Sequence, residues 1–291
     1  EIAAPKSVLA GDALTLRRAS SLGETLTGLP GVSSSYFGPN ASRPVIRGLD
    51  GDRVRVLGNG GAALDAATLS FDHAVPIDPL VVDRIEVLRG PAALLYGGNA
   101  IGGVVNAMDN RIPRQPLKGL SGTAEVRAGG AERELGGAAV IEGGTEAITW
   151  HVDAFGRDTE DLSVPDHVPV EDGTPLEPTD RVRNSSSRAQ GGAIGASVFF
   201  DRGQTGLSVD TYESNYGVVV EPDVRIRMKR DHVAWSGEVR DLGGPALTAS
   251  TTRPPSSSVP PARGLCSSTE PRATMGSGRS GPISASPAAA S

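Results

Sequence analysis

The chain has 291 residues, of which 38% are hydrophobic, and its formal net charge of -6 gives no support for nucleic-acid binding, which calls for a basic surface. Its single cysteine, Cys266, excludes an internal disulfide framework and a cysteine-rich zinc site. No apolar run of about 18 residues occurs, which excludes a transmembrane helix but not the alternating strands of a membrane barrel.

Residues 1–112 show the pattern of a small α+β domain. Ser21 followed by Glu24 is a capping-box pattern and predicts a helix that begins after Ser21. Asp12 is a second predicted N-cap, and Asp78 followed by proline predicts another short helix. Alternating apolar residues predict short strands at 45–47, 53–57 and 85–87. This mixture of short elements is typical of an α+β fold.

Residues 84–106 carry the densest local signal in the chain. They predict a strand at 84–88, a helical turn opened by Pro91, and a second strand that starts at Gly102. Five glycines lie between Gly90 and Gly103, where they permit tight turns and close approach of backbone segments.

From residue 119 to residue 240 the pattern changes to alternation with a period of two. Ile148, Trp150 and Val152 point one way, and the polar residues between them point the other way. The stretch 158–187 is rich in Pro, Asp and Ser and predicts a loop. Alternation by itself fits an outer-membrane barrel or a soluble antiparallel sheet with one wet face equally well.

Residues 245–291 break this alternation. They are rich in Pro, Ser, Ala, Thr, Gly and Arg, which predicts a low-complexity, disordered tail. Two explanations stay open, a frameshift in the gene near codon 245 or a natural disordered tail. At the other end, the chain starts at Glu1 without a starting Met or a signal peptide, as a mature or trimmed form would.

Four blocks in the first segment resemble the plug domain of TonB-dependent outer-membrane receptors: residues 21–32, 42–48, 53–57 and 84–106. The positions that match the plug signature are Arg47, Gly48, Glu86, Arg89, Gly90, Pro91, Tyr96, Gly97, Gly102 and Gly103. The resemblance implies a plug of residues 1–112 followed by antiparallel transmembrane β-barrel strands in residues 113–244. It favours the barrel over the soluble sheet.

The resemblance also implies a function. It implies a receptor in the outer membrane of a Gram-negative bacterium, surrounded by outer-membrane lipid, that takes up a metal ion or metal complex without catalysis. Its partner would be the TonB energy-coupling complex in the periplasm, although no TonB-contacting segment can be identified near Glu1. The family's barrel has about 22 strands. Residues 119–240 supply about six to eight at roughly 10 residues per strand, so the barrel is incomplete and is not expected to transport alone.

Within the family, the chain is most similar to receptors of the zinc-uptake type. The matching blocks are residues 32–39, 71–75, 109–113 and 224–229. This resemblance implies that Asp72 and His73 are zinc ligands, and a carboxylate with an imidazole suits zinc. By chemistry alone, such a pair is more often part of a capped turn. The type's histidine-rich external loop is not evident near residues 216–221.

Alternative functions stay open. An iron-siderophore or haem receptor would share the same plug signature. A soluble plug-like binding or signalling module is the alternative from a different functional class. An enzyme is not predicted, because the chain contains no phosphate-binding loop, no His-Glu-x-x-His and no Gly-x-Ser-x-Gly motif. No cofactor is expected as a catalyst, and Zn²⁺ enters only as cargo.

The remaining charged residues and histidines have structural interpretations. Arg47, Glu86 and Arg89 are expected to form ion pairs with each other or with the inner barrel wall, in a structural or gating role. His151 is expected to face the barrel lumen as a solvated residue, and His167 to lie in a polar surface loop.

Overall fold

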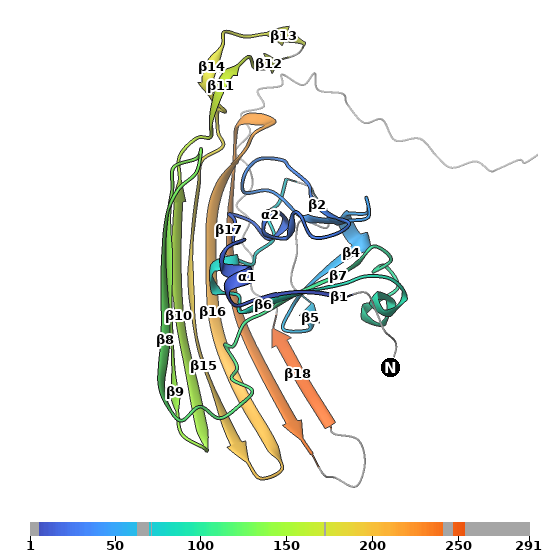
Figure 1. Cartoon of the computed structure of the whole chain (residues 1–291), viewed down its shortest axis with the longest axis vertical. Coiled ribbons are helices and arrows are strands. Elements are labelled where there is room, and N and C mark those ends of the chain that lie inside the picture. Colours follow the sequence, from blue (N-terminus) through green and yellow to red (C-terminus); the bar gives the residue numbers. More distant parts are fainter. Residues whose placement is uncertain (1–5, 63–69, 71, 172, 241–246, 254–291) are drawn as a thin grey trace, which may run out of the picture. The chain divides into compact units, whose positions relative to one another are not determined.

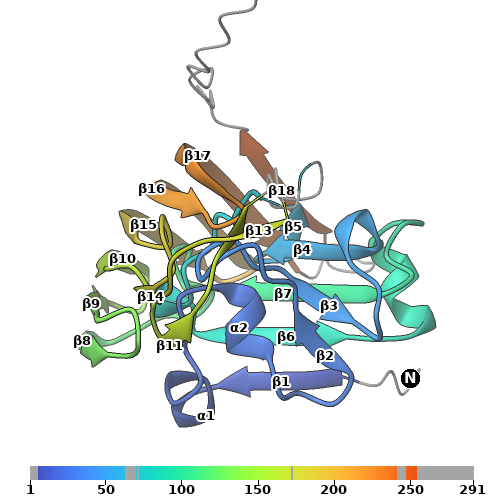
Figure 2. The same ribbon diagram turned by 90° about the horizontal axis from the view of Figure 1, so that it is seen from above.

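A computed structural model describes residues 6–62, 70, 72–171, 173–240 and 247–253 (Figure 1). The described residues form a small α+β region at 6–108, here called the plug region, and a long-stranded sheet at 119–253, here called the barrel sheet. The plug region lies against one face of the barrel sheet (Figures 1 and 2). The predicted fold class, an α+β plug followed by antiparallel barrel strands, is therefore confirmed.

Twelve short elements make up the described part of the plug region: β1 (Lys6–Ala10), α1 (Asp12–Thr15), α2 (Leu22–Leu26), β2 (Val32–Ser34), β3 (Pro44–Ile46), the 3₁₀ turn η1 (Gly51–Arg53), β4 (Val54–Gly58), β5 (Gly61–Ala62), η3 (Pro79–Val81), β6 (Arg84–Leu88), η4 (Pro91–Tyr96) and β7 (Gly103–Met108). Five strands form a mixed sheet in the order β1-β6-β7-β4-β5. Within it β4 and β7 run parallel, and β1 is an edge strand. Strands β2 and β3 pair separately.

Local capping explains two of the helical elements. The Ser21 hydroxyl accepts a hydrogen bond from the Glu24 N–H at 3.2 Å, so the predicted cap of α2 is confirmed. The Asp78 carboxylate likewise accepts from the Leu80 N–H at 3.0 Å and caps η3. The prediction that Asp12 is a cap is wrong. Gly11 occupies that position, and Asp12 is the first residue inside α1.

The signature segment folds as a strand, a 3₁₀ turn and a strand. Pro91 opens η4, and Gly90 and Gly97 flank it with φ of 82° and 125°. Gly103 has a φ of 149°, and a Cβ there would lie 2.8 Å from the Leu88 carbonyl oxygen. Only glycine therefore lets β7 start this close to β6.

The plug region has its own apolar core. Leu26, Ile46, Ile85, Val87 and Val105 are all 0% exposed and belong to one cluster. Because all residues of this cluster come from the plug region, its packing does not depend on a side chain of the barrel sheet.

The barrel sheet contains seven antiparallel strands in the described part of the chain: β8 (Gly119–Gly129), β9 (Glu134–Gly144), β10 (Ile148–Thr159), β15 (Ser187–Phe200), β16 (Gly203–Val218), β17 (Glu221–Val239) and β18 (Leu247–Arg253). Their order in the sheet is β18-β17-β16-β15-β10-β9-β8. No helix among the described residues is long and apolar enough to cross a membrane.

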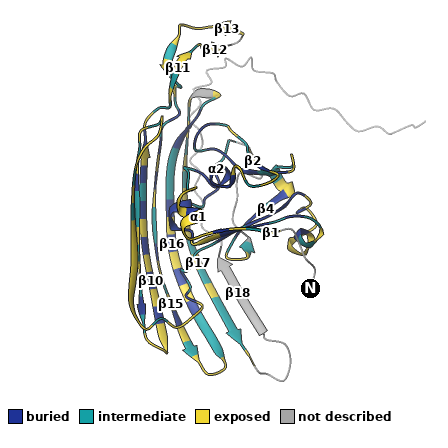
Figure 3. Cartoon of the chain, in the orientation of Figure 1, coloured by how far each residue is buried: buried dark blue, intermediate teal, exposed yellow. Residues whose placement is uncertain are grey.

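The two faces of the barrel sheet have opposite character (Figure 3). On β10, Thr149, His151 and Asp153 are 1–3% exposed on the face toward the plug region. On the other face, Trp150 and Val152 are 37% and 41% exposed. The predicted alternation of β10 is therefore confirmed, with polar side chains toward the plug region and apolar side chains on the other face.

The stretch 158–187 is more ordered than the predicted loop. It contains two short hairpins, made by β11 (Ser163–His167) with β14 (Thr179–Arg181) and by β12 (Val170–Glu171) with β13 (Thr174–Pro175). Backbone pairing gives these segments strand structure despite their polar composition.

Regular structure continues into the predicted low-complexity segment. Strand β18 lies within 245–291 and pairs with β17 from Val233 to Val239. The prediction of a disordered or frameshifted tail otherwise falls on residues 254–291, which lie outside the described residues. The domain boundaries at residues 112 and 244 stay predictions.

Candidate functional site

Asp72 and His73 lie together at the start of an irregular segment, residues 72–78, which we call the strap. The Asp72 Oδ1 and His73 Nδ1 atoms are 3.0 Å apart, and the two side chains are 33% and 24% exposed. Burial acts to raise the pKa of Asp72, but hydrogen bonds from Ser70 and His73 outweigh it, so the pKa is lowered. Both side chains are thus accessible, and the ionised Asp72 carboxylate carries the negative charge that favours a cation.

The first contact between the strap and the barrel sheet is made by Tyr216 on β16. Its hydroxyl accepts a hydrogen bond from the Ala74 N–H at 2.7 Å and donates one to the Asp72 carbonyl oxygen at 3.2 Å. These partners are 142 and 144 residues away in the sequence. A side chain of the barrel sheet therefore holds the backbone on both sides of His73.

Two arginines of the barrel sheet hold the rest of the strap. Arg230 on β17 donates to the Pro76 carbonyl oxygen at 2.9 Å. Arg157 on β10 donates to the Asp78 carboxylate at 2.7 Å, and both of these side chains are at most 4% exposed. Buried ion pairs of this kind are strongly destabilised when one partner is removed.

The strap also faces the plug core. Val75 is 5% exposed and belongs to the plug cluster, and Ile77 packs against the same cluster. The strap thus alternates: groups of residues 72, 74, 76 and 78 bond to the barrel sheet, and side chains of residues 75 and 77 pack into the plug region. It joins the candidate pair to both parts of the molecule.

The linker from the plug region to the barrel sheet, residues 109–118, is fixed by a second set of contacts. Arg111 forms a bidentate pair with Asp153, at 2.8 and 3.1 Å, and approaches Asp210 at 3.2 Å. The Arg111 carbonyl packs directly over Gly195, where a Cβ would collide with it. These charges raise the pKa of Arg111, although burial opposes them. The linker is therefore anchored at Arg111.

The charged signature residues do not pair as predicted. Glu86 pairs with Lys6 at 2.7 Å and with Arg84 at 2.6 Å, because both lie beside it on β1 and β6. Arg89 instead donates to the Pro30 carbonyl and the Ser7 hydroxyl. Arg47 is exposed with a φ of 53°, and within the described ranges it has no ion pair. A structural or gating role for these residues stays a prediction.

His151 lies on the face of the sheet toward the plug region, as predicted, but the prediction that it is solvated is wrong. It is 3% exposed and lies between Glu142 at 2.8 Å and Asp153 at 3.0 Å. Packing of the linker over this part of the sheet removes the solvent. His232 similarly contacts Asp210 at 2.6 Å, whereas His167 lies apart in β11.

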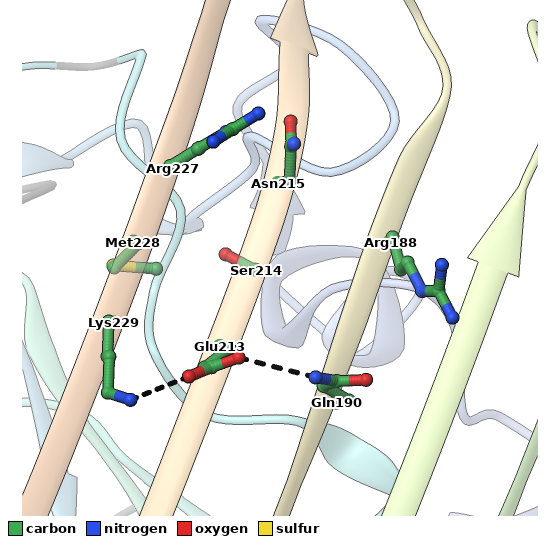
Figure 4. Close-up of a pocket in the computed structure, with 8 residues that line it drawn as sticks. All are labelled: Arg188, Gln190, Glu213, Ser214, Asn215, Arg227, Met228 and Lys229. Carbon is green, nitrogen blue, oxygen red and sulfur yellow. Dashed lines mark hydrogen bonds and ion pairs between the residues drawn. The ribbon is translucent and has the colours of Figure 1, made fainter.

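A pocket of about 260 Å³ opens on strands β15, β16 and β17 (Figure 4). Glu213 holds Lys229 at 2.8 Å and Gln190 at 3.3 Å within it. These side chains alternate along their strands with Tyr212 and Met228, which pack toward the plug region. The pocket therefore opens away from the strap and is not a continuation of the candidate site.

The geometry at the strap suits binding better than catalysis. Asp72 and His73 offer two metal-binding side chains, and no group of three or more such ligands occurs in the part of the chain that the structure describes. The sequence points to this pair but not to Tyr216, Arg157 or Arg230, since nothing in the local pattern marks them as its neighbours. The alternation of the barrel strands indicates only that Tyr216, Arg157 and Arg230 point inward, and it does not show which plug residues they contact.

Comparison with known proteins identifies the N-terminal region. Residues 1–104 match the family described as TonB-dependent Receptor Plug Domain. The chain is 34% identical over 154 residues to the vitamin B12 transporter BtuB of Photobacterium profundum, covering 51% of the chain and 24% of that protein. It is 37% identical over 100 residues to the hemin receptor of Yersinia pestis, covering 34% of the chain and 14% of that receptor. The chain thus spans about a quarter or less of these relatives.

Solved structures extend the likeness to the barrel sheet. A mutant of the ferric enterobactin receptor PfeA from Pseudomonas aeruginosa superposes with a TM-score of 0.68 at 17% identity, covering 86% of this chain and 40% of that one. The copper transporter OprC gives a TM-score of 0.66 at 17% identity, covering 80% and 34%. At this identity the likeness shows the shared fold, a plug with antiparallel barrel strands.

Proposed function

We propose that this chain is part of an outer-membrane receptor that takes up a metal ion or metal complex, because residues 1–104 match the TonB-dependent receptor plug family. The observation that carries the proposal is the plug region packed on one face of an antiparallel sheet whose other face exposes apolar side chains such as Trp150, Ile194 and Leu207. Relatives named as transporters or receptors for vitamin B12, hemin and ferrichrome support transport over catalysis.

In the proposed cycle, cargo binds between the plug and the barrel wall, and the periplasmic TonB complex pulls on the N-terminal end of the plug. Strand β1 is the first described element and lies at the edge of the plug sheet, where it pairs with β6 alone. An edge strand can be separated by breaking one ladder of hydrogen bonds. The strap and the linker contact the barrel sheet and lie farther along the chain, so force reaches them after β1.

Zinc is the proposed cargo, and Asp72 and His73 are its proposed plug ligands. Their side chains are adjacent and partly exposed, and an imidazole with a carboxylate is a common zinc ligand set. A four-coordinate site would need further ligands. The Asp72–His73 hydrogen bond leaves the second imidazole nitrogen to face a cation.

A metal complex is the second candidate cargo. The relatives include a hemin receptor and a ferrichrome transporter, and such cargo is bound through its organic part as well as through its metal. An iron-siderophore or haem would then contact the outer loops of the plug without needing Asp72 or His73 as ligands.

Zinc titration of the purified product of the complete gene separates these candidates. We expect Asp72→Ala and His73→Ala each to weaken Zn²⁺ binding by at least about tenfold, the cost of one lost metal ligand or its close support. His167→Ala is the matched control, because His167 lies in β11, far along the chain from the strap. Unchanged zinc affinity in both strap variants, with retained haem or siderophore binding, would favour the second candidate.

Membrane location is tested on the same protein. Membrane fractionation and heat-modifiable gel migration are expected to show an outer-membrane, detergent-resistant barrel. A product that stays in the soluble fraction and shows no heat-modifiable band would instead support a soluble plug-like module.

A further inference from the structure

We propose that Tyr216 of the barrel sheet is a positioning residue that fixes the Asp72–His73 pair in the strap. This inference rests on the proposed function for its consequence in cargo binding, but the contact itself can be tested without cargo. The pair belongs to the plug region, whereas the group that holds its backbone belongs to β16.

The Tyr216 hydroxyl uses both of its hydrogen-bonding roles on the strap. It accepts from the Ala74 N–H at 2.7 Å and donates to the Asp72 carbonyl at 3.2 Å. His73 lies between these two backbone groups. The hydroxyl therefore acts as a clip that sets the backbone conformation from which both candidate ligand side chains project.

The surroundings of Tyr216 make this clip specific. Its side chain is 1% exposed and packs with Ala41 and Ala74, against which Phe37 and Met228 also pack. Water cannot readily replace the hydroxyl in such a site, so the Ala74 N–H depends on it. A phenyl ring would keep the packing and remove only the clip.

The other barrel contacts of the strap act farther along it. Arg230 holds the carbonyl of Pro76, and Arg157 holds the carboxylate of Asp78. These two contacts fix where the strap lies on the sheet. Tyr216 fixes the end of the strap that carries the Asp72–His73 pair. The position of the two candidate ligands therefore depends on a side chain of the barrel sheet.

The test compares Tyr216→Phe with Tyr212→Phe. Tyr212 lies four residues earlier on the same face of β16 and is 6% exposed, but it packs with Phe155 and Leu80 instead of the strap's first residues. Both variants lose one buried hydroxyl on the same strand, so they share any general effect on the sheet.

Two readouts are measured in the product of the complete gene. Amide hydrogen exchange at Ala74, without metal, reports the clip directly, and Zn²⁺ titration reports its consequence. We expect Tyr216→Phe to speed exchange at Ala74 and to weaken zinc binding about tenfold, as the loss of two hydrogen bonds predicts. Tyr212→Phe should change neither readout.

The outcomes are separable. Unchanged exchange at Ala74 in Tyr216→Phe overturns the inference. So does unchanged zinc affinity in Tyr216→Phe when Asp72→Ala weakens binding. If Asp72→Ala and His73→Ala leave zinc affinity unchanged, the zinc proposal fails by itself, and exchange at Ala74 decides whether Tyr216 holds the pair.

Discussion

The plug sheet and the strap are held in place by different forces. The sheet is stabilised by its own apolar core, in which Ile85, Val87 and Val105 are 0% exposed. The strap shares this core through Val75 and Ile77. Between these two described parts, only the strap is also attached to the barrel wall by polar contacts, from Tyr216, Arg230 and Arg157. Loss of the polar contacts leaves the plug core intact, whereas loss of the core unfolds the sheet. The difference suggests that the strap and the sheet can be released separately.

The largest effect is expected for Arg157→Met. The variant leaves the Asp78 carboxylate, 0% exposed as a side chain, without its ion-pair partner. Breaking a buried pair in this way costs about 3–5 kcal/mol. We expect the free energy of local opening of the strap, measured by hydrogen exchange, to fall by this amount. The control is Arg188→Met. Arg188 is exposed and forms a long, exposed ion pair with Asp158 at 3.8 Å, so its loss should leave the strap unaffected.

The core of the plug sheet is tested by Ile85→Ala. Ile85 is 0% exposed within the plug cluster, and such a truncation typically costs about 2–5 kcal/mol through lost burial and a new cavity. Urea dependence of exchange in β6 and β7 measures this loss. Ile148→Ala, at a position 49% exposed on the outward face of β10, should leave β6 and β7 unchanged. Equal effects of both variants would contradict a self-contained plug core.

A smaller effect is expected at the helix cap of the plug. Ser21→Ala removes the acceptor of the Glu24 N–H and should destabilise α2 by about 1 kcal/mol. Exchange at Glu24 measures the change. Ser21→Asp can replace the cap and should restore protection, so a failure of that variant to do so would argue against capping as the cause.

The smallest effect is a dependence on pH at the edge strand β1. Burial acts to raise the pKa of Glu86, but Lys6 and Arg84 outweigh it and lower the pKa below its ordinary value. The pairing therefore stabilises the sheet above the pKa of the unfolded chain, about 4.3, and this contribution is lost as the pH falls through the lowered pKa. We expect β1 to open more often below about pH 4. Glu86→Gln should remove this pH dependence, and an unchanged dependence would assign it to another group.

The sequence predicts the local elements well because their causes are local. Ser21 and Glu24 are three residues apart, Asp78 precedes the proline that opens η3, and the alternation around Trp150 follows from the geometry of a strand. Each of these patterns can be recognised within a single helix, turn or strand.

The contacts that hold the candidate site have causes that the sequence does not display. Tyr216 and Ala74 are 142 residues apart, and Arg157 and Asp78 are 79 residues apart. Pairing them requires the register of β10 and β16 and the path of the strap over them. The wrong expectations for Glu86 and His151 have a different reason. Their partners, apart from Lys6, are near in sequence, but the choice of partner follows from pairing within the plug sheet and from the linker that covers His151.

One crossed exchange experiment tests the separate attachment of sheet and strap most directly. Amide exchange is measured at Ala74 in the strap and at Val87 in β6, in the unaltered protein, in Tyr216→Phe and in Ile85→Ala. We predict that Tyr216→Phe speeds exchange at Ala74 more than at Val87, and that Ile85→Ala does the reverse. If both variants speed exchange at both amides by the same factor, the strap and the sheet open as one unit, and the account is contradicted.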